Sequence, residues 1–275
     1  MWRSGDLSLA YLTVDGASVD EHLEAAAAAG FAAAGLRILP PSHLTSSGSV
    51  IAHPDRIRRA AQSCASWGVR PLDAEVMCLS PSTGAGDIDA MVSAAAEIGF
   101  QFVQTVVEDD DANRATETLG RLAEAAAQAG VGIALEFMVF RPLSSLDAAQ
   151  RMIERCGSDN VGLVIDALHL SRSGGTPDML AALPTERIAL VQLCDAPAAL
   201  TAKEDLVSEA RNGRLHPGEG GLRLDELLDV LPDGIPLSLE VPHRSFVGQP
   251  FAKRASKSMV ALKQFLERRA RRLGP

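Results

Sequence analysis

Short apolar runs recur along the chain, and each is followed by a stretch with the apolar spacing of a helix. The runs lie at residues 7–14, 33–39, 69–77, 100–108, 132–140, 161–166, 188–195 and 235–241. They are nearly continuous rather than strictly alternating, which is typical of parallel strands covered on both faces. Most begin about 26–36 residues apart, roughly the length that one strand, loop and helix require. The pattern therefore predicts repeated strand–helix units.

Residues that begin and end helices support this division. Ser18 is followed three residues later by Glu21, the spacing of a capping box at a helix start. Glycines stand after helical stretches and just before the next predicted strand, where a helix commonly ends; they are Gly30, Gly68, Gly99 and Gly130.

Eight such units without a domain boundary predict one α/β domain over residues 1–275, a (β/α)8 TIM barrel. The alternative is an open doubly wound sheet. That fold usually carries a glycine-rich phosphate loop after its first strand, and "TVDGASVDEH" has a single glycine there. The longest irregular segment is 196–221, and loops of that length in compact domains are often functional.

Composition narrows the class of protein. The net charge of −9 disfavours general affinity for nucleic acid. The four cysteines form no CxxC pair, so neither a disulfide framework nor a zinc ribbon is indicated. The first residues lack the apolar core of a signal peptide, and no apolar run is as long as a membrane span. We expect a soluble cytoplasmic protein that binds neither nucleic acid nor a membrane.

The last four predicted strands share one feature: each apolar run ends in a side chain with an oxygen donor. The runs are "IALE", "LVID", "ALVQ" and "LSLE", which end at Glu136, Asp166, Gln192 and Glu240. In a TIM barrel the carboxyl ends of the strands surround one mouth, where the active site is built. We therefore expect these four side chains to converge.

Three carboxylates brought together repel one another unless a cation neutralises them. One divalent cation does this most simply. Because all four donors are oxygens, they favour a hard ion, Mn²⁺ or Mg²⁺, and Co²⁺ also fits. A single acidic residue after a strand is more commonly a helix cap, but four in register point to a shared metal site.

The chain resembles the xylose-isomerase-like TIM barrels over nearly its whole length, most specifically in its second half. The motifs that carry the resemblance are "ALEF", "VIDALH", "VQLCDAP", "PGEGG" and "LEVP". This family includes sugar isomerases, ketose 3-epimerases, hydroxypyruvate isomerase, inosose dehydratase and 3-dehydroshikimate dehydratase. The resemblance implies that Glu136, Asp166, Gln192 and Glu240 are the metal ligands. Glutamine at the third position is more similar to the hydroxypyruvate isomerase and dehydroshikimate dehydratase branches.

The expected reaction is proton abstraction next to the carbonyl group of a sugar or a hydroxy-keto acid, through a metal-bound enediolate. Glu136 and Glu240 lie on roughly opposite sides of the predicted ring, so one can serve as base and the other as acid. Reprotonation then gives an isomer or an epimer, which we rank first as a function in carbohydrate metabolism. Loss of a β-hydroxyl gives dehydration, the lyase alternative.

Five residues are candidates for substrate binding. His169 matches the D-x-x-H pattern of the family, and His216 belongs to its glycine-rich turn. The arginines can hold a carboxylate or phosphate with two hydrogen bonds, and these are Arg37, Arg172 and Arg211. Among the loop arginines Arg211 is preferred over Arg214, while Arg37 interrupts an apolar run and could instead pair with a core carboxylate such as Asp73.

Two other classes remain open. One is an endonuclease of the same superfamily, which uses a histidine-rich zinc cluster; this chain has six histidines and an acidic charge balance. The other is a non-catalytic sugar-binding protein that has kept the barrel. The resemblance also leaves room for a homo-oligomer, since relatives are often dimers or tetramers.

Overall fold

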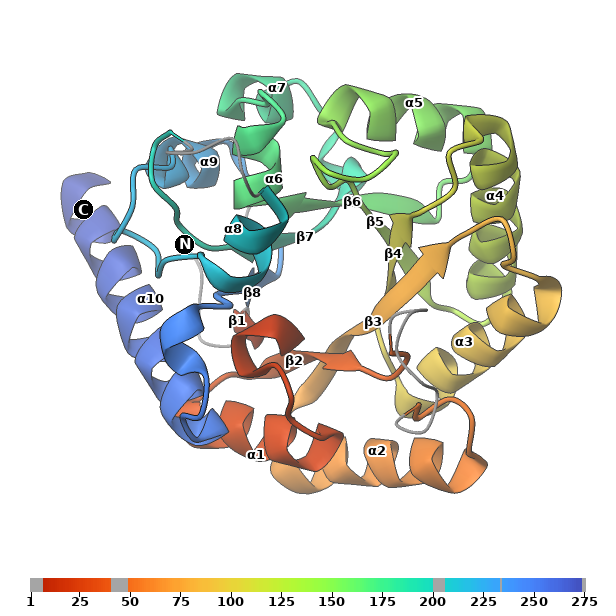
Figure 1. Cartoon of the computed structure of the whole chain (residues 1–275), viewed down its shortest axis with the longest axis horizontal. Coiled ribbons are helices and arrows are strands. Elements are labelled where there is room, and N and C mark those ends of the chain that lie inside the picture. Colours follow the sequence, from red (N-terminus) through yellow and green to blue (C-terminus); the bar gives the residue numbers. More distant parts are fainter. Residues whose placement is uncertain (1–6, 41–48, 200–205, 233, 274–275) are drawn as a thin grey trace.

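The computed structural model describes residues 7–40, 49–199, 206–232 and 234–273, and shows a closed parallel barrel surrounded by helices (Figure 1). The strands follow one another around the ring in sequence order, and the first pairs with the last. They are β1 (Leu7–Leu9), β2 (Ala33–Arg37), β3 (Arg70–Leu79), β4 (Phe102–Val107), β5 (Gly132–Glu136), β6 (Val161–Asp166), β7 (Ile188–Leu193) and β8 (Leu237–Leu239). The predicted TIM barrel is confirmed.

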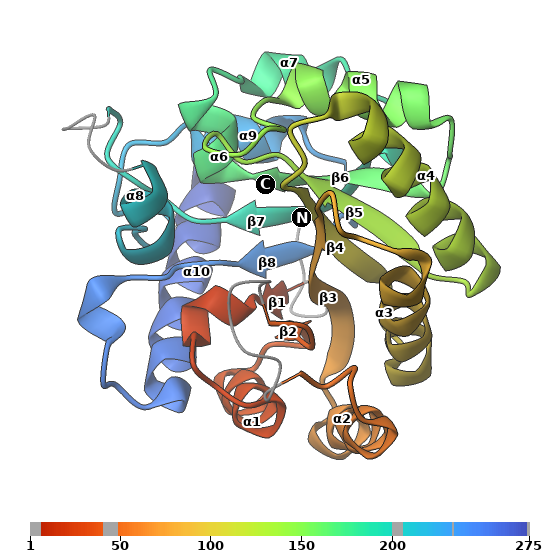
Figure 2. The same cartoon turned by 45° about the vertical axis from the view of Figure 1, so that its right-hand side comes forward.

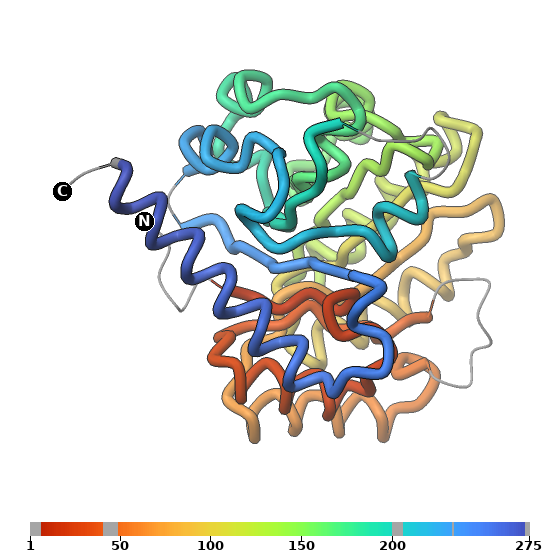
Figure 3. The backbone as a smooth tube through the Cα atoms, turned by 60° about the vertical axis from the view of Figure 1, so that its left-hand side comes forward, coloured from red at the N-terminus to blue at the C-terminus, as the bar shows by residue number. Residues whose placement is uncertain are grey.

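Helices surround the barrel, and α8 lies beyond the carboxyl ends of β7 and β8, over the mouth (Figures 1 and 2). They are α1 (Val19–Ala29), α2 (Pro54–Trp67), α3 (Ala85–Ile98), α4 (Ala112–Gln128), α5 (Leu146–Cys156), α6 (Ala167–Arg172), α7 (Pro177–Ala181), α8 (Leu206–Asn212), α9 (Leu224–Val230) and α10 (Phe251–Leu273). The long α10 packs beside α1, so the last helix completes the ring next to the first (Figure 3). None of the described helices is both long and apolar enough to cross a membrane.

The predicted helix boundaries are present. Ser18 and Glu21 form the capping box of α1: the Glu21 carboxylate accepts a hydrogen bond from the Ser18 backbone N–H at 2.8 Å. Gly30, Gly68 and Gly99 end α1, α2 and α3 in the left-handed conformation, which a residue without a Cβ adopts without strain.

The first predicted strand is shorter than expected. We predicted residues 7–14, but β1 ends at Leu9 and Tyr11–Val14 form a 3₁₀ helix, η2. The side chain of Thr13 explains the difference. Its hydroxyl donates to the carbonyl oxygen of Leu239 at 2.8 Å and accepts from the N–H of Val241 at 2.9 Å. A side chain thus takes over contacts to β8 that a longer β1 would make through its backbone.

The other loops also differ in detail from the sequence pattern. The irregular segment predicted over 196–221 contains α8, and residues 200–205 within it lie outside the described part of the chain. β5 ends at Glu136 rather than at residue 140, so this carboxylate stands at the strand end.

Alternation along the strands places an apolar layer beneath a polar one inside the barrel. Ala134, Val164 and Leu190 form a small buried cluster with Ala189 and Phe102. Two residues further along β5, β6 and β7 the side chains point the same way, because successive strand residues alternate between faces. Those positions carry Glu136, Asp166 and Gln192. The apolar layer therefore closes the barrel below its polar mouth.

One buried histidine links the helical layer to the barrel. His22 of α1 is 1% exposed, and its Nε2 lies 3.1 Å from the carbonyl oxygen of Leu9 at the end of β1. Burial lowers the pKa of His22 to about 4. The folded protein therefore keeps this ring neutral at pH values where an unfolded chain protonates it.

We predict that the protein loses stability in acid partly through His22. As the pH falls from about 6.5 to about 4, His22 binds a proton in the unfolded chain but stays neutral in the folded chain. The unfolding free energy therefore falls, by up to about 3 kcal/mol from this residue. Urea unfolding measures the free energy of unfolding at pH 7 and at pH 4.5. The decrease between these pH values should be about 2 kcal/mol smaller in His22→Gln than in the wild type. An equal loss in both proteins would contradict the assignment.

Candidate metal and catalytic site

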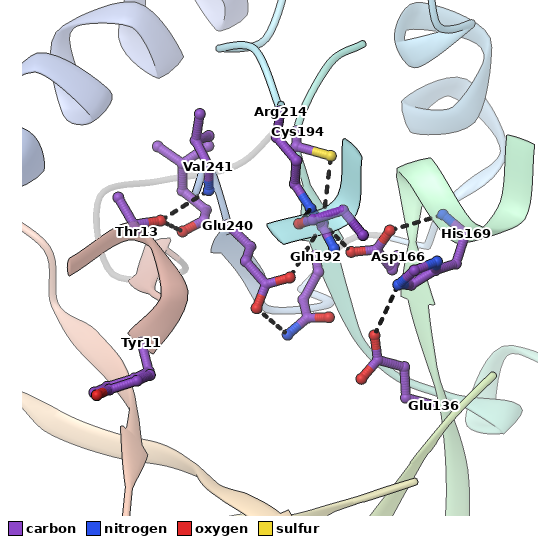
Figure 4. Close-up of polar contacts among 12 residues, drawn as sticks. Tyr11, Thr13, Glu136, Asp166, His169, Gln192, Cys194, Arg214, Glu240 and Val241 are labelled. Atoms are coloured by element: carbon purple, nitrogen blue, oxygen red, sulfur yellow. Dashed lines mark hydrogen bonds and ion pairs between the residues drawn. The ribbon is translucent and has the colours of Figure 1, made fainter. Parts of the chain in front are cut away.

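The four predicted oxygen donors lie at one mouth of the barrel and are buried (Figure 4). Asp166 of β6 is directly opposite Gln192 of β7 in the strand register, and Gln192 is opposite Ser238 of β8. The amide of Gln192 donates to Glu240 Oε1 at 3.3 Å. The pairing of the parallel strands, beyond a register shift between Leu163 and Val164, is therefore what brings these side chains to a common height.

Gln104 of β4 joins this group, although the sequence analysis did not include it. Its amide nitrogen donates to Glu136 Oε2 at 2.7 Å, and its oxygen accepts from the Gln192 amide at 3.4 Å. The signal in the sequence was a lone amide within the apolar run "FVQTVV". Gln104 orients the Glu136 carboxylate and extends the polar layer to a fifth strand.

Arg214 is the cation at the centre of the group. Its side chain is 2% exposed, it forms an ion pair with Asp166, and its Nη1 lies 3.1 Å from Glu240 Oε2. The same nitrogen donates to the Cys194 sulfur at 3.4 Å, and Nε donates to the carbonyl oxygen of Ala210 in α8 at 2.8 Å. From the sequence we expected Arg211, rather than Arg214, to be the anion contact. Both line the cavity, but Arg211 is exposed and Arg214 is buried against the carboxylates. No local pattern distinguishes the two, because the loop conformation decides which one is buried.

The carboxyl groups differ in protonation. Burial raises the pKa of Glu136 well above its usual value, and the Glu240 and Asp166 carboxylates raise it further. Burial also raises the pKa of Glu240 to about 8, against the opposing effect of Arg214. Burial is the largest single effect on Asp166 and acts in the same direction, but the charges and hydrogen bonds of Arg214 and His169 together lower the pKa of Asp166. Asp166 is thus ionised at neutral pH, while the two glutamates can hold and release protons.

His169 lies closer to the group than a loop position suggests. Its backbone N–H donates to Asp166 Oδ1 at 2.8 Å, since Asp166 caps the first turn of α6. Its Nε2 is 3.9 Å from Glu136 Oε1, and its ring meets Phe140 edge-on. Burial lowers the pKa of His169 to about 4, so the imidazole is neutral and can accept a hydrogen bond or bind a metal.

The residues present fit a divalent cation. Ligand atoms of Glu136, Asp166 and His169 lie within 4.8 Å of one another, and all three side chains are buried. The Oε1 of Gln192 is a buried acceptor that has no hydrogen-bond partner among the residues that the structure describes. Carboxylate oxygens, amide oxygens and an imidazole nitrogen together can bind a divalent cation. Mg²⁺ prefers the oxygen ligands, whereas Zn²⁺ also binds the imidazole nitrogen readily. His169 thus adds a nitrogen to a donor set that we expected to be all oxygen.

A cavity of about 280 Å³ opens beside these groups. Glu136, Glu240 and His169 line it, and so do two of the arginines proposed from sequence, Arg37 and Arg211. It lies near the lower end of the roughly 300–1,000 Å³ range typical of ligand pockets. The cavity is therefore suited to a small metabolite.

The other two predicted substrate residues are placed elsewhere. Arg172 forms an ion pair with Glu209 of α8 at 2.6 Å and donates to the carbonyl oxygen of Pro197. His216 lies between Glu219 at 3.1 Å and Ser258 of α10 at 3.2 Å. Neither is among the described residues that line the cavity: Arg172 joins α6 to α8, and His216 joins its loop to α10.

A second pair of buried carboxyl groups lies on β3. Arg37 binds Glu75 at 3.1 Å, rather than Asp73 as the sequence suggested. Within the described part of the chain, Oδ1 of Asp73 is buried and has no hydrogen-bond partner, and burial raises the pKa of Asp73 well above the usual value. A Cβ on Gly35 would lie 2.7 Å from both Asp73 carboxylate oxygens. The missing side chain at Gly35 therefore makes room for these acids.

Comparison with known proteins identifies a family and several relatives to which this chain is similar. A family model described as "Xylose isomerase-like TIM barrel" matches residues 23–265. The chain is 35% identical over 159 residues to 3-dehydroshikimate dehydratase of Pseudomonas aeruginosa, covering 56% of this chain and 24% of that protein. It is 26% identical over 135 residues to inosose isomerase of Halalkalibacterium halodurans, covering 47% and 45%. Each match thus spans less than half of the relative's own length.

Solved structures share the fold at lower identity. The IOLI protein, whose structure holds a zinc atom, matches with a TM-score of 0.78 and 17% identity over 96% of this chain and 99% of that one. An L-ribulose 3-epimerase matches with a TM-score of 0.70 and 16% identity over 97% and 96%.

We predict that Arg214 and Asp166 stabilise the apoprotein as a pair. In EDTA, Arg214→Gln leaves buried carboxylates without their cation and should lower the unfolding free energy by about 3 kcal/mol or more. Asp166→Asn keeps the helix cap but removes the charge. The double variant should be more stable than the sum of the two losses implies, with a coupling of about 1 kcal/mol or more. Strict additivity in denaturant unfolding would contradict the pairing.

Proposed function

Since the chain belongs to the xylose isomerase-like TIM barrel family, we propose that it is an enzyme that isomerises or epimerises a sugar or hydroxy-keto acid. The reaction begins with removal of a proton next to the substrate carbonyl. The observation that carries this proposal is the pair of buried glutamates, Glu136 and Glu240, which line one cavity from β5 and from the end of β8.

The environments of the two glutamates suit proton transfer. A carboxylate whose pKa is raised toward neutral is a stronger base than a solvated one and still ionises at working pH. Gln104 donates to Oε2 of Glu136, whereas Oε1 of Glu136 lies 3.9 Å from Nε2 of His169. Gln192 and Arg214 hold the oxygens of Glu240. One glutamate accepts the proton at a carboxylate oxygen, and the other returns a proton to the neighbouring carbon or to the opposite face.

The proposed metal ligands are Glu136, Asp166, Gln192 and Glu240, with His169 as a further donor. A bound Mn²⁺ or Mg²⁺ would polarise the substrate carbonyl and acidify the adjacent C–H. Arg214 neutralises part of the same charge, so Asp166 and Glu240 would hold the ion while also paired with this guanidinium. Arg37 and Arg211 are proposed to contact substrate from the cavity wall.

Dehydration is the second candidate function. The specific observation that favours it is the 35% identity to the 3-dehydroshikimate dehydratase of Pseudomonas aeruginosa. The same base removes the proton, and the acid then protonates a departing β-hydroxyl group instead of a carbon. The chemistry of the site is shared up to this last step.

Product analysis in D₂O tests the function and separates its outcomes. The metal-loaded protein is incubated with keto sugars, hydroxypyruvate, inosose and 3-dehydroshikimate, and products are followed by NMR. Deuterium in an isomer or at an inverted centre supports the first proposal, whereas an alkene product supports dehydration. Absence of both exchange and product across the panel would contradict proton abstraction at this site.

We predict that Glu240→Gln lowers the rate of substrate turnover at least about 100-fold, because the amide cannot exchange a proton with the substrate carbon. Thermal unfolding should stay near that of the wild type, since Gln preserves the shape of the side chain. Glu97→Gln, at an exposed position of α3, is the matched control and should keep full activity. Full turnover by Glu240→Gln would rule out its catalytic role.

We also predict that one Mn²⁺ binds each chain, measured by the loss of the free-ion signal in electron paramagnetic resonance. Asp166→Asn should weaken this binding by about tenfold or more, because it removes a charged ligand. Asp147→Asn, at an exposed position in the first turn of α5, should leave it unchanged. Equal affinity in both variants would place the ion elsewhere.

A further inference from the structure

Two arginines in the cavity wall keep hydrogen-bonding capacity that their contacts with the described residues do not fill. Arg37 is the last residue of β2, and Arg141 lies in the loop after β5. Both side chains line the cavity that holds Glu136 and Glu240, and they are 17% and 25% exposed. The Nε–H of each is buried and has no hydrogen-bond partner among the described residues. Buried charged donors without partners cost free energy, so two partly exposed guanidinium groups of this kind in the wall of one cavity indicate a ligand that accepts hydrogen bonds.

Each guanidinium is held in place by a carboxylate. Arg37 binds Glu75 at 3.1 Å and lies 4.6 Å from the centre of the Tyr11 ring. Arg141 binds Glu108 at 2.7 Å. These contacts use the Nη atoms of the two side chains and fix their planes. The unused Nε–H groups are therefore preorganised rather than mobile.

The two guanidinium groups act on the same part of the cavity. Cys78, near the end of β3, also lines it. Burial raises the pKa of the Cys78 thiol to about 11, while Arg141 and Arg37 both act in the opposite direction on that one group. In a ring of eight strands β3 is opposite β7, the strand that precedes Arg214. The arginine pair thus lies across the cavity from the Arg214 cluster.

We propose that Arg37 and Arg141 bind a carboxylate of the substrate, and that the enzyme acts on a hydroxy-keto acid rather than on a neutral sugar. Planar guanidinium donors match the planar carboxylate group. With the carboxylate against Arg37 and Arg141, the rest of a small molecule extends toward Glu136 and Glu240. This assignment of substrate class rests on the proposed function, but the recognition of the charge can be measured without turnover.

The test compares probes that differ only in charge. Isothermal titration calorimetry of the Mn²⁺-loaded protein measures binding of quinate, a ring polyol with a carboxylate, and of its methyl ester. We expect quinate to bind about tenfold or more tightly than the ester, the factor that one charge-assisted hydrogen bond supplies. A second pair, myo-inositol 1-phosphate and myo-inositol, shows whether a phosphate is preferred instead.

Variants then locate the recognition. Arg37→Gln and Arg141→Gln should each reduce the preference for quinate over its ester to about twofold, while Arg37→Lys keeps the charge and should restore part of it. Arg58→Gln, an exposed arginine of α2 that pairs with Asp55, is the matched control and should retain the full preference.

Several results would overturn the proposal. They are equal binding of quinate and its ester, a preference for the phosphate, no binding of any probe, or a preference that survives in both glutamine variants. Deuterium incorporation into the substrate, which depends on Glu136 and Glu240, is measured separately. If no deuterium is incorporated but quinate still binds more tightly than its ester, the proposed reaction is contradicted while the proposed carboxylate site is supported.

Discussion

Burial of several carboxyl groups at one barrel mouth is the constraint on which the site depends. Asp166, Glu136 and Glu240 are each at most 3% exposed, so water screens their mutual repulsion poorly. Arg214 reduces this repulsion by pairing with Asp166 and Glu240. Gln104 and Gln192 donate hydrogen bonds to the glutamates. The result is an unequal set in which one carboxylate is ionised and two can carry protons. That inequality is what acid–base chemistry at neutral pH requires.

The barrel supplies this arrangement through strand geometry. The same face of β5, β6 and β7 carries small or branched apolar residues and, one step higher, polar ones. The lower layer seals the interior, and the register between neighbouring strands sets the height of the upper layer. A shift of one residue in any of these strands would turn its polar group outward into the helical layer.

The sequence predicted the parts of this structure that depend on local periodicity. Strand positions, the α1 capping box and the placement of Glu136, Asp166, Gln192 and Glu240 at strand ends all follow from spacing. The parts it did not predict depend on loop conformation. Whether Arg211 or Arg214 turns inward, and whether His216 faces the cavity or α10, is decided by contacts between segments far apart in the chain. Gln104 was recognisable in principle, since an amide in an apolar strand needs partners.

Side-chain contacts, and not only the backbone, connect the loop between β7 and β8 to the carboxylates. Arg214 donates to the carbonyl oxygen of Ala210, so its guanidinium is tied to the backbone of α8, and Glu209 of the same helix binds Arg172 of α6. The position of the short helix α8 therefore sets the position of the Arg214 charge at the mouth. A neighbouring molecule or a substitution that displaces α8 would move this charge, and so would change the electrostatic potential at Asp166 without any movement of the barrel strands.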